Sequence, residues 1–251
     1  MPHAAIDEQM RDNWESSFRE QIASQAYNAA PAEALVRNVA YWLREARPDG
    51  NYAGLRFLEA GCGAGPNLLH LAAKGIRVSG VDISPTALDL CRENFRRAGM
   101  ERLLEAAVES SVERLPFPDG SFDGVLESCV FQHLPRDVRQ QAFAEVARVL
   151  RPGGVFCGYM LSDSHSVYRL KRDRELAEDP GTLMLQEGGS RFYLTDTGLS
   201  HFFRRDEYRG LLPGFATVDP CLVEYDLPEF EAKKRGYAEY RQGMWALFAV
   251  K

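Results

Sequence analysis

Glycines at alternate positions follow an acidic residue in the first third of the chain. Glu59 is followed by Gly61, Gly63 and Gly65, and Pro66 comes next. Glycines remove side chains from a turn, so that its backbone can come close to a ligand. Pro66 suits the first position of a helix, where its missing N–H would have no partner. The spacing predicts a strand, a glycine loop and a helix that expose main-chain groups to a ligand.

A second acidic residue, Asp82, ends a stretch over 77–81 that has the composition of a strand. In doubly wound α/β sheets, an acid at this place accepts hydrogen bonds from the ribose hydroxyls of a bound nucleoside. The two features together predict a nucleoside site between the loop at 61–65 and Asp82.

The glycine spacing helps to decide which nucleoside is bound. A dinucleotide fingerprint, Gly-x-Gly-x-x-Gly, would need glycine at position 66, where the chain has proline. The pattern over 59–65, followed by Val-Asp-Ile-Ser-Pro over 81–85, resembles the class I methyltransferases that use S-adenosylmethionine. This resemblance disfavours a nicotinamide-dependent dehydrogenase.

Two further segments carry the same resemblance. Leu-Pro-Phe-Pro-Asp-Gly-Ser-Phe-Asp over 115–123 resembles the family's connection from the third strand to the fourth, and Pro-Gly-Gly over 152–154 resembles the turn before the fifth. The resemblance covers residues 55–160 well. It implies an α/β fold with a Rossmann-like, doubly wound, seven-stranded, mostly parallel sheet whose last strand is antiparallel.

The resemblance also implies which residues hold the cofactor, S-adenosylmethionine. They lie in the glycine loop, at the end of the second strand, after the third strand and at the end of the fourth. The implied cofactor-binding residues are Glu59, Gly61, Cys62, Gly63, Gly65, Asp82, Ile83, Ser111, Val112, Glu113, Glu127 and Ser128. Glu59 is implied to brace the loop or to reach the amino end of the cofactor. The backbone around Glu127 and Ser128 is implied to contact the methionine ammonium.

One position departs from the family pattern. Related enzymes often have an acid that accepts a hydrogen bond from the adenine amino group, where this chain has Ser111 followed by Val112. The Ser111 hydroxyl can accept that bond without charge, and Val112 can offer its backbone N–H to the ring. Glu113 could replace the acid if the loop shifts. The sequence leaves Ser111 and Glu113 as alternatives.

Three residues are candidates for catalysis. Methyl transfer from a sulfonium needs a general base only when the acceptor is protonated at rest. His133, which follows the fourth strand, is the first candidate, because an unperturbed imidazole titrates near neutral pH. His165 and Asp163, after the fifth strand, form a second candidate pair. Each of the three also has a plain structural interpretation.

The remaining pattern predicts the elements that position these residues. Residues 1–50 are expected to form an N-terminal helical lid, and 51–251 the methyltransferase domain. The charged segment 161–193 interrupts the alternation of strands and helices, and we interpret it as a substrate-side insertion. The further expected elements are strands at 55–59, 76–82, 103–108, 124–128, 155–160, 216–225 and 244–250 and helices at 66–74, 85–98, 136–150 and 197–212, the last with Thr195 or Asp196 as N-cap.

The bulk composition restricts the partners. The 251 residues carry a net charge of −6, which argues against a nucleic-acid partner and favours a small-molecule methyl acceptor. Five widely separated cysteines predict neither disulfides nor a metal site. No apolar run is long enough to span a membrane, and the N-terminus lacks a signal-peptide core. We expect a cytoplasmic protein, and the oligomeric state is left open.

Two functions follow from these features. The leading hypothesis is a methyltransferase that transfers a methyl group from S-adenosylmethionine to an oxygen or nitrogen atom of a small molecule. The alternative is a non-catalytic or regulatory protein that kept the fold and the cofactor, because a fold alone does not determine activity.

Overall fold

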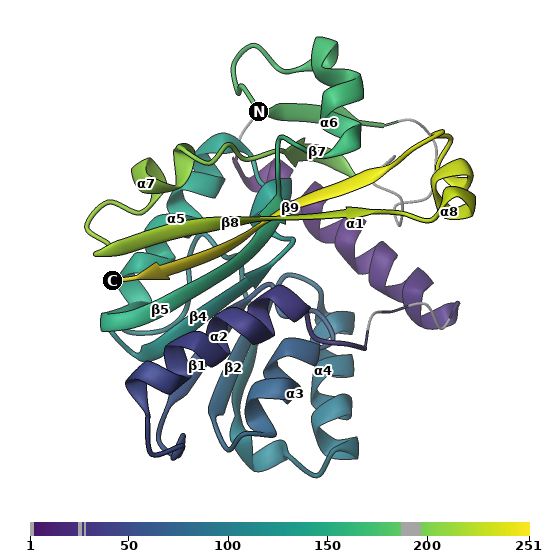
Figure 1. Cartoon of the computed structure of the whole chain (residues 1–251). Helices are drawn as coiled ribbons and strands as arrows, with labels where there is room; N and C mark the ends of the chain where they lie inside the picture. The colour runs from purple at the N-terminus through teal and green to yellow at the C-terminus, as the bar shows by residue number, and fades with distance from the viewer. Residues whose placement is uncertain (1–2, 25–26, 28, 187–196) are drawn as a thin grey trace.

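A seven-stranded sheet forms the centre of the molecule (Figure 1). The structure, a computed structural model, describes residues 3–24, 27, 29–186 and 197–251. The strand order is β3-β2-β1-β4-β5-β9-β8. The strands are β1 (Arg56–Ala60), β2 (Arg77–Asp82), β3 (Leu104–Glu109), β4 (Phe122–Ser128), β5 (Leu150–Leu161), β8 (Thr217–Asp226) and β9 (Arg241–Val250). Strands β1 to β5 pair in parallel, whereas β9 is antiparallel to both β5 and β8. The predicted sheet with an antiparallel last strand is confirmed.

Helices cover both faces of the sheet. The face with α2 (Glu33–Ala46), α3 (Pro66–Ala72) and α4 (Pro85–Arg97) is opposite the face with α5 (Arg136–Val149) and α7 (Glu207–Leu211). Figure 1 shows α2 and α3 in front of the sheet. Within β1, Phe57 packs into the first layer and Leu58 into the second. Because both faces are buried, the central strands carry apolar residues on both faces rather than alternating apolar and polar residues.

The parallel strands all end on one edge of the sheet. The last residues of β1 to β5 are Ala60, Asp82, Glu109, Ser128 and Leu161. Ligands of open α/β sheets bind beyond the carboxyl ends of the strands, where the strand order reverses. Every predicted site residue lies on or shortly after one of these ends.

The N-terminal segment predicted as one helical lid divides into two parts. Helix α2 packs directly against the sheet. The Asn38 amide donates to the carbonyl of Leu247 in β9 over 3.1 Å, and Trp42 contacts Phe57 edge to face. Helix α1 (His3–Ala23) instead lies over the carboxyl ends of the strands, next to α4. The part that covers the predicted site is therefore α1.

The segment after β5 forms a small structure of its own above the sheet edge (Figure 1). Helix α6 (Ser166–Lys171) and the 3-10 turn η3 (Arg172–Arg174) lead to β6 (Thr182–Leu185). Strand β6 pairs antiparallel with β7 (Gly198–His201). Together with α8 (Glu229–Lys234), this β6–β7 pair borders the carboxyl ends of β4 and β5.

The predicted helix over 197–212 is wrong in its first half. Residues 198–201 form β7, and the helical part is the short α7. Gly198 has φ +77°, and the backbone beyond it pairs with β6. Pairing across the chain thus outweighs the helical spacing of the apolar residues. The predicted N-caps, Thr195 and Asp196, lie outside the described residues.

Candidate active site

A cavity of about 890 Å³ lies at the carboxyl ends of the strands. It is lined by most of the predicted site residues: Glu59, Gly61, Cys62, Gly63, Asp82, Ile83, Ser111, Val112, Ser128, His133 and His165. Four others, Gly65, Glu113, Glu127 and Asp163, do not line it. The structure therefore brings eleven of the fifteen predicted site residues, from five strand ends, to one cavity and leaves the other four outside its lining.

The glycine loop needs glycine for two physical reasons. Gly61 has φ +79°, and a Cβ atom there would overlap the side chain of Val130. Gly65 also has φ +79°, and a Cβ atom there would lie 2.5 Å from the Cys91 sulfur. Gly65 therefore allows α4 to pack beneath the loop rather than contacting a ligand itself.

Asp82 joins the loop to the end of β2. One carboxylate oxygen accepts the Gly63 N–H over 2.8 Å, and the other accepts the Ser84 N–H over 3.0 Å. Burial raises the pKa of Asp82, and these backbone donors partly offset that effect. Each carboxylate oxygen has two lone pairs, so both can still accept from ligand hydroxyls.

Glu59 presents a buried oxygen without a partner. Its Oε1 accepts from the Asn67 amide over 2.6 Å, and the Asn67 carbonyl oxygen accepts the Ala32 N–H over 2.8 Å. Its Oε2 accepts no hydrogen bond from any of the residues that the structure describes. Burial raises the pKa of Glu59 well above its ordinary value. An ammonium group bound in the cavity would satisfy this oxygen and favour the charged carboxylate.

Glu127 braces the turn after β4 and does not itself line the cavity. Its Oε1 accepts the N–H groups of Val130 and Phe131 over 2.6 and 3.1 Å, and burial raises its pKa to about 7. Cys129 has φ +60°, a strained value for a residue with a side chain. The bonds from Glu127 hold this turn, so that Ser128 and Cys129 line the cavity.

Ser111 and Glu113 are distinguished by position. Ser111 and Val112 line the cavity next to the end of β3, whereas Glu113 does not. Arg11 of α1 pairs with Glu109 over 2.5 Å at the same strand end. Of the two alternatives for the adenine contact, the geometry supports Ser111.

Helix α1 closes the cavity on the side of the glycine loop. Glu15 accepts from the Ser84 hydroxyl over 2.6 Å and from the Thr86 N–H over 3.2 Å. Burial alone would raise the pKa of Glu15, but these hydrogen bonds outweigh it and lower the pKa to about 2. The Phe18 ring lies over Gly63, with 3.1 Å to a Cβ atom placed there. Glu15 thus ties the covering helix to the start of α4.

His133 is buried and held in one tautomer. Its Nδ1–H donates to the Leu199 carbonyl over 3.1 Å, and its Nε2 accepts from the Gln132 amide over 3.2 Å. The Gln132 orientation is fixed because its Oε1 accepts the Leu161 N–H over 2.8 Å. Burial lowers the pKa of His133 to about 4. His133 therefore lacks the near-neutral pKa that made it a candidate general base.

His165 and Asp163 do not act as a pair at the cavity. His165 lines it, and its Nδ1 accepts the Val167 N–H over 3.2 Å at the start of α6. Burial lowers the pKa of His165 to about 4. Asp163 lies outside the cavity and is half-buried, with Arg169 and Arg204 as neighbouring charges. The structure thus does not bring Asp163 to the cavity; its backbone N–H donates to the Phe203 carbonyl over 3.1 Å.

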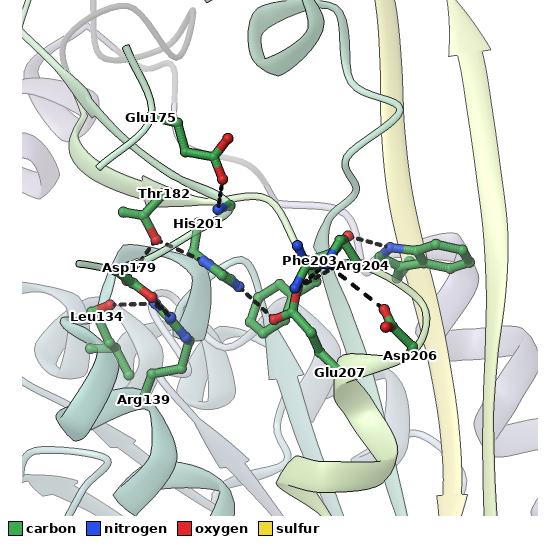
Figure 2. Close-up of polar contacts among 12 residues, drawn as sticks. Leu134, Arg139, Glu175, Asp179, Thr182, His201, Phe203, Arg204, Asp206 and Glu207 are labelled. Atoms are coloured by element: carbon green, nitrogen blue, oxygen red, sulfur yellow. Dashed lines mark hydrogen bonds and ion pairs between the residues drawn. The ribbon is translucent and has the colours of Figure 1, made fainter. Parts of the chain in front are cut away.

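A buried polar network fixes the β6–β7 pair against α5 and α7 (Figure 2). Arg139 donates to both oxygens of Asp179 over 2.8 and 3.1 Å. The Thr182 hydroxyl contacts Asp179 over 2.6 Å and His201 over 2.7 Å, and the other ring nitrogen of His201 lies 2.9 Å from Glu207. Burial lowers the pKa of His201. Nothing in the sequence pattern linked these residues.

The family assignment follows from this region of the chain. A family model described as a methyltransferase domain matches residues 58–158. These residues contain the glycine loop, Asp82, the Ser111 segment and the turn braced by Glu127. Residues 58–158 thus form a methyltransferase domain of the class I, S-adenosylmethionine-dependent type. S-Adenosylmethionine is the cofactor of this family.

Relatives of this methyltransferase cover parts of the chain. A fatty-acid O-methyltransferase from Mycolicibacterium smegmatis is 36% identical over 137 residues, which are 53% of this chain and 46% of that protein. The match thus spans less than half the length of that relative.

Solved structures share the fold over most of the chain. A methyltransferase from Methanosarcina mazei is 24% identical with a TM-score of 0.61, covering 82% of this chain and 97% of the other. The 1,6-didemethyltoxoflavin-N1-methyltransferase of Burkholderia thailandensis, solved with 1,6-didemethyltoxoflavin and S-adenosylhomocysteine, is 19% identical with a TM-score of 0.61. It covers 100% of this chain and 90% of the other.

Sequence reasoning missed three residues of the methyltransferase site. Asn67 orients Glu59, Gln132 orients His133, and Glu15 holds α1 in place. Asn67 directly follows the glycine loop and Pro66, so its position next to the motif could have indicated it. Glu15 and Gln132 act through long-range contacts for which the sequence holds no local signal.

Proposed function

We propose that this chain binds S-adenosylmethionine in the cavity and transfers its methyl group to an oxygen or nitrogen atom of a small-molecule acceptor. The observation that carries the proposal is the unpartnered Oε2 of Glu59, which is buried in a family-typical site together with Asp82 and the glycine loop. A buried carboxylate oxygen without a donor is costly, and a bound ammonium removes that cost.

The residues present fit the cofactor group by group. Glu59 would accept from the amino group, Asp82 from the ribose hydroxyls, and Ser111 from the adenine amino group, while Val112 would donate its N–H to the adenine ring. The backbone at Ser128 would contact the methionine end. When bound, the sulfonium supplies a methyl group that is already activated for displacement. The chain's own tasks are alignment and exclusion of water.

We also propose that α1 acts as the lid and that the insertion after β5 shapes the acceptor site. Trp14, Phe18 and Gln21 of α1 line the cavity, as does Leu161 at the end of β5. Within the described residues, no helix is both long and apolar enough to cross a membrane. The net charge of −6 supports a small acceptor rather than nucleic acid. We propose a cytoplasmic location, since the chain's five cysteines are all unpaired.

Calorimetric titration with S-adenosylhomocysteine tests the cofactor site. Asp82→Ala should weaken binding by about 1.5–3 kcal/mol, because charge-assisted hydrogen bonds to the ribose are lost. Asp89→Ala, at an exposed position on α4, is the matched control and should bind like the wild type. Equal dissociation constants for Asp82→Ala and the control would refute the ribose role.

The non-catalytic alternative is favoured by one observation. Both histidines at the cavity have pKa values of about 4, so neither is a base at neutral pH. Incubation with S-adenosylmethionine and metabolite extracts separates the alternatives. Formation of several equivalents of S-adenosylhomocysteine per protein supports the enzyme. Tight binding of S-adenosylmethionine without product formation supports the alternative.

A further inference from the structure

One part of the cavity lining comes from β9 and its neighbours and has a distinct chemistry. It consists of Leu161, His165, Arg235, Tyr240, Gln242 and Met244, which we call the β9 wall. These residues come from the end of β5, the residues after it, the end of α8, and β9 with the residue before it. None of these six residues except His165 belongs to the predicted site, so most of the β9 wall is open to an acceptor.

The charges on the cavity surface are divided. Among the described lining residues, the carboxylates are Glu59, Asp82 and Glu109, and all lie at the ends of β1 to β3. The β9 wall carries one cation, Arg235, and no carboxylate. Glu231 fixes Arg235 over 2.7 Å from outside the cavity lining. A positively charged acceptor would find no carboxylate on this wall, whereas an anion would meet Arg235, which would then contact both Glu231 and the anion.

Two buried hydrogen-bond donors lie next to Arg235. His165 and Tyr240 are 2% and 5% exposed, and their rings meet edge to face at 5.3 Å. The Arg235 guanidinium lies 5.6 Å from the centre of the Tyr240 ring. Within the described part of the chain, His165 Nε2 and the Tyr240 hydroxyl are not among the fully buried atoms that lack a partner, and both residues line the cavity. A ligand in the cavity can therefore accept hydrogen bonds from them.

Both groups are neutral donors at neutral pH, and the Tyr240 hydroxyl can also accept. Because His165 Nδ1 accepts the Val167 N–H, the neutral ring must carry its proton on Nε2. Burial keeps His165 neutral and raises the pKa of Tyr240, so the phenol keeps its proton. The wall therefore combines two donors and a cation but no group that takes a proton from an acceptor.

We propose that the methyl acceptor is a carboxylate with an apolar body, bound by Tyr240, His165 and Arg235 and methylated on oxygen. This inference rests on the proposed function. A carboxylate is ionised at neutral pH and needs no general base, which matches the β9 wall. Leu161 and Met244 would contact the apolar body. The similarity to a fatty-acid O-methyltransferase supports this acceptor class.

The reaction balances without a proton transfer. A lone pair of the carboxylate oxygen forms the new bond to the methyl carbon, and the electron pair of the broken carbon–sulfur bond stays on sulfur. The products are a neutral methyl ester and a neutral thioether. The ester has lost the charge that Arg235 attracts, which favours its release.

Two matched sets of probes test the acceptor class with the full chain. One is decanoate, 1-decanol and decylamine; the other is phenylacetate, 2-phenylethanol and phenethylamine. Binding is measured by calorimetry in the presence of saturating S-adenosylhomocysteine, and methyl-ester formation by mass spectrometry with S-adenosylmethionine. At least one carboxylate should bind about tenfold or more tightly than its alcohol and amine and should yield its methyl ester. Absence of binding by both carboxylates, or tighter binding of an alcohol or amine, would overturn the inference.

Tyr240→Phe tests the wall directly. It keeps the ring that contacts His165 and Arg235 but removes the hydroxyl, so the preferred carboxylate should bind about tenfold more weakly. Tyr237→Phe is the control, because its ring lies 5.0 Å from Tyr240 but does not line the cavity. Binding of S-adenosylhomocysteine should be unchanged in both variants. Failure of S-adenosylhomocysteine to bind the wild type would refute the proposed function, whereas failure of the carboxylates alone would refute this inference.

Discussion

The two sides of the cavity are held in place by different kinds of interaction. On the cofactor side, carboxylates accept N–H groups that are close in sequence or on the neighbouring strand end, as Asp82 and Glu127 do. On the acceptor side, the β6–β7 pair depends on the network from Arg139 to Glu207, which joins residues up to 40 positions apart. The cofactor side is thus determined by short sequence motifs, whereas the β6–β7 side depends on contacts that form only in the completed fold.

Asp179→Ala should have the largest effect among the substitutions that test this difference. The substitution leaves Arg139, whose side chain is only 4% exposed, buried without a counter-ion. The free energy of unfolding should therefore fall by about 3–5 kcal/mol in chemical denaturation. S-Adenosylhomocysteine should still bind at wild-type affinity below the unfolding transition, because the cofactor side does not use this network. Asp173→Ala, at an exposed position, should change stability by less than about 0.5 kcal/mol. A loss of cofactor affinity without a loss of stability would show that the two sides are not independent.

Glu127→Gln tests the cofactor side through pH. The Glu127 pKa of about 7 lies above its ordinary value of 4.5, so the folded state binds more protons between these values. The wild type therefore loses stability relative to Glu127→Gln as pH rises from 5 to 8, by up to about 3 kcal/mol. Urea denaturation at several pH values measures this difference. Parallel pH profiles for the two proteins would contradict the buried-carboxyl account.

Glu15→Ala should have the smallest effect on stability. It removes an acceptor for the Thr86 N–H at the start of α4, which costs about 0.5–2 kcal/mol. Because Glu15 also ties α1 over the cavity, S-adenosylhomocysteine should dissociate faster in stopped-flow measurements. Glu20→Ala, on an exposed turn of the same helix, is the control. Identical dissociation rates in both variants would mean that α1 does not retain the cofactor.

The same difference explains what the sequence could predict. The glycine loop, Asp82 and the sheet order were predictable, because each depends on a short motif or on the alternation of strands and helices. The tautomer of His133 and the place of Asp163 were not, because they depend on Gln132, on Leu199 of β7 and on the course of the chain after β5. Asp163 shows the limit plainly: although it lies two residues before His165 in sequence, it does not line the cavity that His165 lines.

The structure of the complex with S-adenosylhomocysteine tests the central claim most directly. The account predicts that the ligand's amino group lies within hydrogen-bond distance of Glu59 Oε2 and that both ribose hydroxyls donate to Asp82. A complex in which Glu59 Oε2 keeps no partner and the ribose lies away from Asp82 would contradict it.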